Sequence, residues 1–350
     1  MARILYALSG EGMGHAIRSQ IVIKKLQKDH NMLIACGGKA YHHLDRHFDK
    51  VIHVQSLHIG YKNNKVSSWK TFFINIGNLF SHFSSFKFLY ITIKRFKPDI
   101  IINDFEYITN YLSFLMGIPN IIIDNQQIIV KSRIRFSKKL RWDFIKSWLV
   151  VRFIVPKADF SFITSFFFPQ LKIKNAAYCL PVIREEIRKV KTKTKDYILV
   201  YQTSKTNKKL LRILKQSGNK FKIYGFGIIK TKGNLEFKEF NEKEFIKDLA
   251  ESKAVIINGG FTVMSEALYL MKPILAIPIE KQFEQELNAL YLQRLGYGMN
   301  TQKATSKVVA EFVDRIPEFR EKLVAYSHYD NELFFEQLGK KIDVLIKNKK

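Results

Sequence analysis

The stretch that most constrains the fold is residues 255–289, which read VIINGGFTVMSEALYLMKPILAIPIEKQFEQELNA. An apolar run at Val255–Ile257 predicts a buried strand, and a helical repeat of apolar residues opens at about Thr262. Between them, Gly259 and Gly260 predict a tight turn. Glycines at a strand-to-helix junction let backbone N–H groups approach an anion closely, and the positive end of the helix favours a phosphate there.

A polar cluster follows the next predicted strand, Ile274–Pro278. Its members cannot all be core residues, and side chains of this kind recognise hydroxyl groups. They are Gln282, Glu284, Gln285 and Asn288. The second half of the chain thus pairs a candidate phosphate turn with candidate hydroxyl-binding groups.

A glycine-rich loop follows the first predicted strand, Arg3–Leu8. Residues 9–15 read SGEGMGH and lead into an amphipathic helix predicted at Ile17–Leu26. The spacing is G-x-G-x-G, so the G-x-G-x-x-G fingerprint of dinucleotide sites receives little support. The loop instead carries a histidine, His15, at its exit.

Apolar runs bounded by turns alternate with helical stretches, which is typical of parallel α/β sheets. The first series is 4–8, 32–35, 51–54, 100–103, 121–123 and 160–164. The second is 197–201, 222–224, 235–237, 255–257 and 274–276. A chain of 350 residues is too long for one ordinary core, so we predict two domains, 1–180 and 196–325. The charged, proline-opened segment 181–195 is predicted to be the linker.

The second half of the chain resembles the donor-binding signature of UDP-sugar glycosyltransferases of the two-domain GT-B fold. The residues that carry the resemblance are Asn258-Gly259-Gly260-Phe261, Glu266, Pro273, Pro278 and Glu284-Gln285-x-x-Asn288-Ala289. Ser265-Glu266 is closer to the lipid-acting N-acetylglucosaminyltransferases of peptidoglycan synthesis (the MurG-like group). The chain departs from the plant-type signature at Asn258, where a His is usual, and at Thr262, where an Asn is usual. Asn103-Asp104-Phe105-Glu106 and Asp124-Asn125-Gln126 also look like an uncharacterised prokaryotic branch of these enzymes.

The resemblance implies two Rossmann-like domains that face each other across a cleft, with a C-terminal helix in 326–350 packing back on the first domain. It implies that the glycine turn holds the diphosphate, that Glu266 binds the ribose hydroxyls and that Glu284 and Gln285 bind the sugar. The donor site expected on this basis comprises Gly259, Gly260, Phe261, Thr262, Ser265, Glu266, Glu284, Gln285 and Asn288, with Thr203 and Ser204 as further diphosphate contacts.

The resemblance also implies that His15 is the general base, oriented by an acidic residue at the end of a first-domain strand. Asp104 is favoured for that role, and Glu106 is the open alternative. The acceptor-binding residues expected on this basis are Gly12, Gly14, Glu106, Asn125 and Gln126. In-line attack from the opposite face would invert the anomeric configuration. Because no D-x-D pair occurs, we expect no essential metal and no cofactor besides the UDP-sugar substrate.

The formal charge of +27 raises the question of a partner. Basic residues interleave with aromatic residues in two segments, Trp69–Lys97 and Lys131–Lys157. Such segments are typical of contact with an anionic membrane, whereas no nucleic-acid-binding motif accompanies them. They therefore favour a lipid-linked acceptor at the membrane surface and no nucleic acid partner. The alternative is a compositional Lys and Ile bias without function.

Two cysteines form no redox or metal motif, and the sequence has no recognisable leader or run of about 20 apolar residues. We expect a cytoplasmic enzyme, peripherally associated with the inner face of the membrane and involved in making the cell envelope. Two other functions stay open at this stage. One is a UDP-sugar 2-epimerase of the same fold, and the other is a non-catalytic basic protein that binds membranes or nucleic acid.

Overall fold

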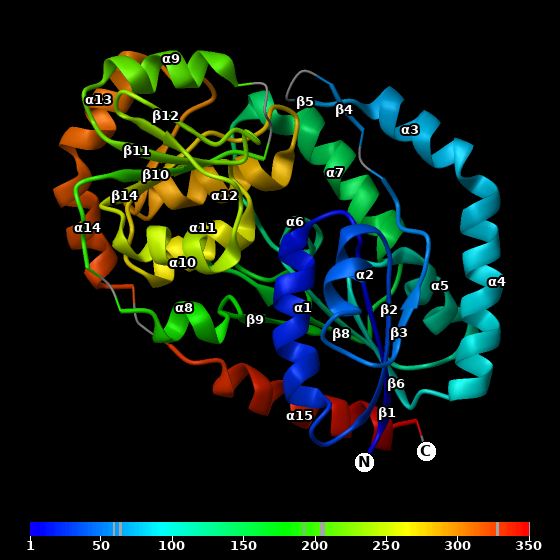
Figure 1. The fold of residues 1–350 in the computed structure, drawn as a ribbon. Helices are drawn as coiled ribbons and strands as arrows, with labels where there is room; N and C mark the ends of the chain where they lie inside the picture. The colour runs from blue at the N-terminus through cyan, green and yellow to red at the C-terminus, as the bar shows by residue number, and fades with distance from the viewer. Residues whose placement is uncertain (59, 63–64, 192, 204–206, 327–328, 350) are drawn as a thin grey trace. The chain divides into compact units, whose positions relative to one another are not determined.

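The computed structural model describes residues 1–58, 60–62, 65–191, 193–203, 207–326 and 329–349. The chain folds into two compact units (Figure 1). The first comprises Met1–Gly60, Ser67–Val182 and Asp330–Lys350. The second comprises Tyr61–Val66 and Ile183–Tyr329.

The first unit is built on a seven-stranded sheet of order β3-β2-β1-β6-β7-β8-β9, in which all neighbours are parallel. Its strands are β1 (Arg3–Leu8), β2 (Asn31–Cys36), β3 (Val51–His53), β6 (Ile100–Asp104), β7 (Asn120–Asp124), β8 (Phe160–Thr164) and β9 (Ala176–Cys179). Its helices are α1 (Met13–Leu26), α2 (Gly38–Leu44), α3 (Ser68–Gly77), α4 (Leu79–Phe96), α5 (Tyr107–Met116), α6 (Gln127–Lys131), a 3-10 turn (Lys138–Leu140), α7 (Arg141–Ile154) and α15 (Glu332–Lys347).

The central strand β1 is buried on both faces. Ile4, Tyr6 and Leu8 belong to a core cluster that includes side chains of α1 and α15. Leu5 and Ala7 belong to a second cluster that includes side chains of α4 and α5. Because successive strand residues point to opposite faces, this division shows that helices cover both sides of the sheet.

The second unit has a sheet of order β12-β13-β11-β10-β14-β15-β16. All neighbours are parallel except the antiparallel pair β12 and β13. Its strands are β10 (Ile198–Tyr201), β11 (Phe221–Tyr224), β12 (Lys230–Lys232), β13 (Leu235–Phe237), β14 (Ala254–Ile257), β15 (Ile274–Ala276) and β16 (Gly298–Asn300), and a separate hairpin is formed by β4 (Tyr61–Lys62) and β5 (Lys65–Val66). Its helices are α8 (Glu185–Lys189), α9 (Lys208–Gln216), α10 (Glu242–Glu251), α11 (Phe261–Tyr269), α12 (Phe283–Arg294), α13 (Ser306–Asp314) and α14 (Ile316–Val324).

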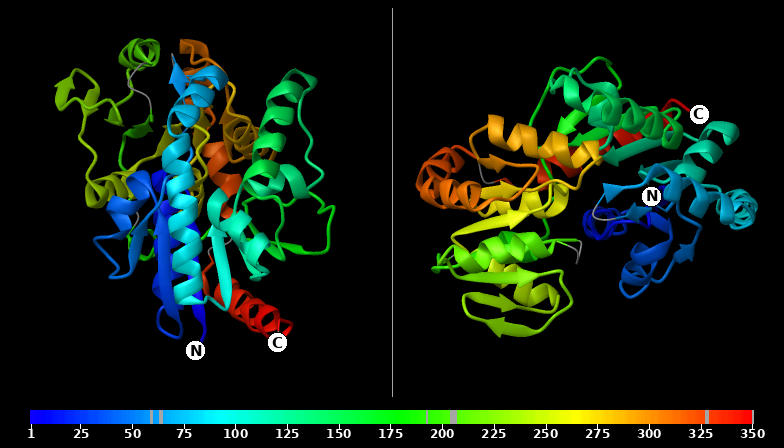
Figure 2. Two further views of the ribbon diagram at one scale, coloured as in Figure 1. Left: turned by 90° about the vertical axis from the view of Figure 1, so that its right-hand side faces the viewer. Right: turned by 90° about the horizontal axis from the view of Figure 1, so that it is seen from above.

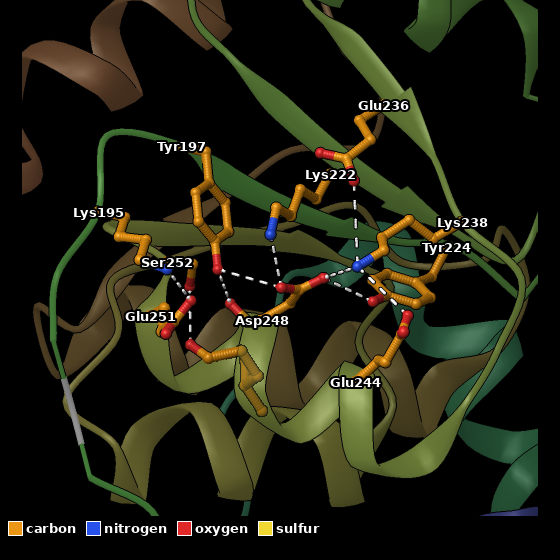
Figure 3. Close-up of polar contacts among 11 residues, drawn as sticks. Lys195, Tyr197, Lys222, Tyr224, Glu236, Lys238, Glu244, Asp248, Glu251 and Ser252 are labelled. Atoms are coloured by element: carbon orange, nitrogen blue, oxygen red, sulfur yellow. Dashed lines mark hydrogen bonds and ion pairs between the residues drawn. The ribbon is translucent and has the colours of Figure 1, made fainter. Parts of the chain in front are cut away.

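A polar network centred on Asp248 fastens α10 to β11 and to the segment after β13 (Figure 3). Its carboxylate accepts hydrogen bonds from Lys222 at 2.6 Å, Lys238 at 2.9 Å and the Tyr224 hydroxyl at 2.7 Å. Burial alone would raise the pKa of Asp248, but these donors lower it below its ordinary value. The buried carboxylate is therefore well compensated.

The sequence predicted the central strands of both sheets, but it missed β9, β12, β16 and the hairpin of β4 and β5. β9, β12 and β16 are short strands at the sheet edges. β12 reads Lys-Thr-Lys and is exposed throughout, so it carries no apolar signal. The segment 181–195, predicted as a linker, contains helix α8, and the helical stretch predicted from about Lys307 divides into α13, α14 and α15.

Candidate functional site

His15 and Asp104, the predicted catalytic pair, are in direct contact. His15 lies in the first turn of α1, and Asp104 is the last residue of β6. The His15 Nδ1 atom is 2.7 Å from Asp104 Oδ1. Because β6 pairs with β1, Asp104 lies beside Leu8, at the edge of the sheet from which the glycine-rich loop leaves. The parallel register thus brings together two residues that are 89 positions apart.

Arg18 and Ser19 hold the other side of Asp104. Arg18 donates from Nε to Oδ2 at 3.0 Å and from Nη2 to Oδ1 at 2.6 Å, and the Ser19 hydroxyl donates to Oδ2 at 3.2 Å. Asp104 is fully buried. Burial alone would raise its pKa, but the charges and hydrogen bonds of Arg18 and His15 lower it below the ordinary value. Asp104 is therefore held as a carboxylate.

Phe105 connects this pair to the next helix in an uncommon conformation. Its φ of 61° is in the left-handed region, which few residues other than glycine adopt. Its ring stacks on His15 with centroids 6.3 Å apart. Backbone strain of this kind persists when the surroundings enforce it, and it gathers at functional sites.

Glu106 has a different role from the one predicted. Its carboxylate caps α5, accepting from the backbone N–H groups of Ile108 at 2.9 Å and Thr109 at 2.8 Å and from the Thr109 hydroxyl at 2.5 Å. The side chain is buried. Glu106 therefore does not orient His15, and Asp104 is the carboxylate that contacts the histidine.

The segment after β7, which holds the predicted acceptor residues Asn125 and Gln126, is buried. Asn125 donates to the Thr164 carbonyl at 2.9 Å, and Asp124 Oδ1 accepts from the Gln127 N–H at 2.8 Å. Within the described ranges, the buried atoms here that have no hydrogen-bond partner include Asp124 Oδ2, Asn125 Oδ1, Gln127 Nε2 and Thr164 Oγ1. Burial raises the pKa of Asp124 to about 7. Buried polar groups of this kind are suited to ordered water or to a polar ligand.

The glycine-rich loop is fixed by close backbone contacts. A Cβ atom on Gly10 would lie 2.4 Å from the Gly37 carbonyl oxygen, so no larger residue fits there. Gly12 is the N-cap of α1, and Gly14 lies in its first turn. Gly12 and Gly14, two of the predicted acceptor-binding residues, thus lie near His15 and can offer only backbone groups to a ligand.

The predicted phosphate turn joins β14 to α11, whose N-cap is Gly260. A Cβ atom on Gly259 would lie 2.3 Å from the Gln285 carbonyl oxygen, whereas one on Gly260 would meet nothing within 4 Å. In the described part of the chain, no side chain caps α11. The first N–H groups of a helix lack intrahelical partners, so those of α11 can accept an anion.

Amide side chains brace this turn. Gln285 Oε1 accepts from the backbone N–H groups of Gly259 at 3.2 Å and Ile279 at 3.0 Å, and Asn288 donates to the Gly259 carbonyl at 3.1 Å. Asn258 accepts from the Thr203 N–H at 3.0 Å and donates to the Ile277 carbonyl at 2.9 Å. These bonds tie the carboxyl ends of β10, β14 and β15 together. Gln285 was predicted to bind the sugar, and its side-chain oxygen accepts from the backbone N–H groups of Gly259 and Ile279 instead.

Glu266 is buried and paired with an arginine that the sequence analysis did not single out. Arg184 donates from Nε to Oε1 at 2.6 Å and from Nη2 to Oε2 at 2.8 Å, and its Nη1 atom contacts Glu242. Burial raises the pKa of Glu266 above its ordinary value; Arg184 opposes this shift, and the negative charges of Glu242 and Glu186 add to it. Each carboxylate oxygen still has a second lone pair for a ligand hydroxyl.

The remaining predicted donor residues surround the same turn. The Ser265 hydroxyl donates to the Phe261 carbonyl at 2.8 Å, and both residues are buried. Thr262 and Glu284 are half-buried in the first turns of α11 and α12. Thr203 is exposed at the end of β10, and Ser204 lies outside the described residues.

Sequence reasoning missed Arg18 and Arg184. Both are buried although arginine is mostly exposed in proteins. A signal was available for Arg18, since a residue three positions after His15 shares its helix face. Arg184 lies in the charge-rich segment predicted as a linker, where nothing distinguishes it from its neighbours.

Three helices of the first unit, α4, α5 and α7, expose several large apolar side chains. α5 contacts both α4 and α7, and the side chains exposed on these helices are Leu79, Phe80, Phe83, Phe88, Tyr90, Ile91, Phe114, Leu115, Trp142, Leu149, Val150 and Phe153. Figure 2 (left) shows α4 and α7 along one side of this unit. Of the helices in the described ranges, none is both long and apolar enough to span a bilayer.

Comparison with known proteins gives a consistent result. The family model described as Glycosyl transferase family 1 matches residues 2–317. An uncharacterized glycosyltransferase from Methanosarcina mazei is 26% identical over 272 residues, covering 69% of this chain and 71% of that protein. The structure is similar to the spinosyn forosaminyltransferase SpnP, with a TM-score of 0.68, 12% identity and coverage of 98% and 99%. It is also similar to MurG from Acinetobacter baumannii, with a TM-score of 0.61, 14% identity and coverage of 99% of each chain. The predicted fold class, two parallel α/β sheets of the GT-B type, is confirmed.

Proposed function

Because the chain belongs to Glycosyl transferase family 1 and is a glycosyltransferase, we propose that it transfers a hexose-type sugar from a UDP-sugar to an acceptor hydroxyl by inverting, metal-independent displacement. The observation that carries the proposal is the 2.7 Å contact between His15 and Asp104 at the carboxyl edge of the first sheet. Ligands of open α/β sheets bind outside the carboxyl ends of the strands.

In this mechanism His15 is the general base. The acceptor hydroxyl gives its proton to His15 Nε2 as its oxygen forms a bond to the anomeric carbon. The bond from that carbon to the diphosphate oxygen breaks, and its electron pair leaves with the diphosphate. Asp104 stabilises the imidazolium that forms, and the N-terminus of α11 stabilises the negative charge on the leaving group.

The proposed diphosphate site can be tested at Gly260, where a Cβ atom meets nothing within 4 Å. Gly260→Asp places a carboxylate at the N-cap of α11. Aspartate is a favoured N-cap, so the helix should keep or gain stability, while the new charge competes with the diphosphate for the same N–H groups. We expect UDP affinity, measured by calorimetry, to fall about 100-fold, which corresponds to the loss of one or two charge-assisted hydrogen bonds.

Gly260→Ala is the matched control, since it fills the same space without charge and should bind UDP nearly as well as the parent. Unchanged UDP affinity in Gly260→Asp would place the donor elsewhere. Replacing UDP with dTDP in the same titrations tests which nucleotide the site prefers.

A lipid-linked acceptor at an anionic membrane is the finer part of the proposal. It is supported by the exposed apolar side chains of α4, α5 and α7 and by the formal charge of +27. Apolar side chains with nearby basic groups bind anionic interfaces, because each supplies a separate favourable contribution. The membrane would then bring the acceptor to the unit that carries His15.

Vesicle co-sedimentation tests this part. Changing Lys138, Lys139 and Arg141 to Glu should weaken binding to anionic vesicles at low salt. Part of the binding should persist at high salt, and changing Phe80 and Phe83 to Ser should weaken that part. Ile229→Ser, an exposed apolar residue of the second unit, is the control. Indifference to lipid charge would make a soluble acceptor the better proposal.

One activity assay separates the reaction classes. The protein is incubated with UDP-hexoses and a lipid extract, and nucleotide and sugar products are analysed together. UDP release coupled to glycolipid formation supports the transferase, and isomerised UDP-sugar would indicate an epimerase. If neither glycolipid nor isomerised UDP-sugar forms, the proposed UDP-dependent transfer to a lipid-linked acceptor is contradicted.

A further inference from the structure

Arg18 controls the charge of the carboxylate that His15 contacts. The guanidinium binds both oxygens of Asp104, and one of these oxygens, Oδ1, also contacts His15 Nδ1. Arg18 and Asp104 are both buried. A buried carboxyl without a cation would favour its neutral form, because burial disfavours charge.

The charge of Asp104 decides which nitrogen of His15 carries the proton. An ionised carboxylate can only accept, so the 2.7 Å contact then requires a proton on Nδ1. Arg18 Nη2 also lies 3.2 Å from Nδ1, but its 2.6 Å hydrogen bond to Asp104 Oδ1 is the shorter of its two contacts. Nε2 is left without a proton and can act as a base. A protonated Asp104 could instead donate to Nδ1, which would leave the proton on Nε2 and block its action as a base.

The other groups around Asp104 cannot replace Arg18. Tyr6 on β1, Asp124 after β7 and Cys179 on β9 all lie within electrostatic range of Asp104 or Arg18. Each is neutral when protonated and anionic when ionised, so none supplies a positive charge. Burial raises the pKa of Tyr6 and of Cys179, which keeps both neutral near pH 7. Ser19 adds a hydrogen bond to Oδ2 without charge.

We propose that Arg18 is a positioning residue of the transfer reaction: by holding Asp104 as a carboxylate, it fixes the proton of His15 on Nδ1 and leaves Nε2 free to take the proton of the acceptor hydroxyl. This inference rests on the proposed function. Its structural half, the tautomer of His15, can be measured without any substrate.

The experiment is ¹⁵N NMR of the histidine-labelled protein at a pH at which the His15 ring is neutral. The signals of His15 are assigned by their loss in His15→Gln. In the parent protein we expect Nδ1 to be protonated and Nε2 to be unprotonated. In Arg18→Gln, which keeps a hydrogen-bond donor but removes the charge, the proton should shift substantially to Nε2. Lys24→Gln, which removes an exposed charge from the same helix, should leave the tautomer unchanged.

Turnover supplies the second readout. Arg18→Gln should lower kcat about 100-fold with little change in KM, a loss expected when a reacting group is misplaced. Arg18→Lys keeps the charge without the two-point fork, so it should retain the Nδ1 tautomer and recover part of the activity. A folded Arg18→Gln protein with the parent tautomer would overturn the proposal, even if transfer is slowed.

If Arg18→Gln does not fold, the carboxyl carbon of Asp104 is titrated in the parent protein. The proposal requires this carboxyl to take up its proton below the ordinary value of about 4. Protonation at or above that value would overturn it. The parent tautomer together with no transfer to any acceptor would instead contradict the proposed function and leave the assignment of Arg18 intact.

Discussion

Each unit holds one buried arginine that binds a buried carboxylate through two nitrogens, yet the two pairs differ in their electrostatics. Arg18 and His15 lower the pKa of Asp104. Burial raises the pKa of Glu266 although Arg184 binds it just as closely. Asp104 contacts both Arg18 and His15. Glu266 contacts Arg184, which also binds Glu242. Burial, the neighbouring cations and the neighbouring carboxylates together, and not the salt bridge alone, set the direction in which the pKa of the buried acid shifts.

The largest effect should come from His15, which contacts Asp104 in addition to Arg18. His15→Ala should lower turnover by about 10²–10⁴-fold, because general-base catalysis contributes that much. UDP binding measured by calorimetry should be nearly unchanged. His47→Ala, at an exposed histidine of the same unit, serves as the control. Near-normal turnover of His15→Ala would show that His15 and the Arg18–Asp104 pair have a structural role only.

The second largest effect should come from removing the arginine of the other pair. Arg184→Met leaves Glu266 buried without its cation, which should cost about 3–5 kcal/mol of unfolding free energy at pH 7. A raised pKa means that ionising Glu266 destabilises the folded state as the pH rises through the raised value. The loss should therefore be smaller at pH 5, where urea unfolding is repeated.

Arg315→Met is the control for this variant. Arg315 also contacts two carboxylates, Glu311 and Glu318, but at the surface. Its removal should change stability little, since exposed ion pairs contribute about 0–1 kcal/mol. Equal losses for Arg184→Met at both pH values would show that its cost arises from packing and not from the charge of Glu266.

A third effect tests the extra carboxyl near Arg18. The pKa of Asp124 is raised to about 7, so its ionisation destabilises the folded protein as the pH rises from about 4 to about 7. Asp124→Asn cannot ionise and should be more stable by about 1–4 kcal/mol at pH 8, with an advantage that shrinks toward pH 5. Thermal melts across this range measure it, and Asp49→Asn on the surface is the control. A variant that is less stable at pH 8 would mean that the Asp124 carboxylate is stabilised in the folded state.

The smallest effect concerns the corresponding extra carboxyl near Arg184. Glu242 is half exposed, so Glu242→Gln loses a screened ion pair and relieves a repulsion on Glu266 at the same time. We expect a change of less than about 1 kcal/mol in urea unfolding. A larger loss would show that Glu242 is a necessary second partner of the arginine and not a competitor for it.

Apolar runs predicted most of the central strands, and the resemblance to GT-B glycosyltransferases predicted that His15 pairs with an acidic residue at the end of a first-domain strand. Buried parallel strands leave continuous apolar runs, and their register then fixes which residues meet at the carboxyl edge. The edge strand β12 was missed because it is exposed and reads as a loop. Periodicity also did not separate Asp104, the last residue of β6, from Glu106, which lies two positions later.

The partners of the site could not be predicted for a different reason. Arg18, Arg184 and the oxygen of Gln285 act through contacts between residues 26 to 86 positions apart. Glu106 has the same side chain whether it caps a helix or binds a ligand, and only the local geometry of α5 reveals the cap. Sequence patterns predict the strands and helices that carry a site. The charge balance of the site depends on tertiary contacts, which the patterns do not contain.

Residues 330–350 belong to the first unit although residues 183–329, which precede them, belong to the second. Phe334, Leu338 and Ile342 of α15 are buried in the same cluster as Ile4, Val22 and Leu26. During synthesis on a ribosome, the second unit is therefore complete before the first can close its core. Until α15 has been synthesised, the nascent first unit exposes the apolar face that α15 later covers. During this interval the chain is open to chaperone binding and to aggregation.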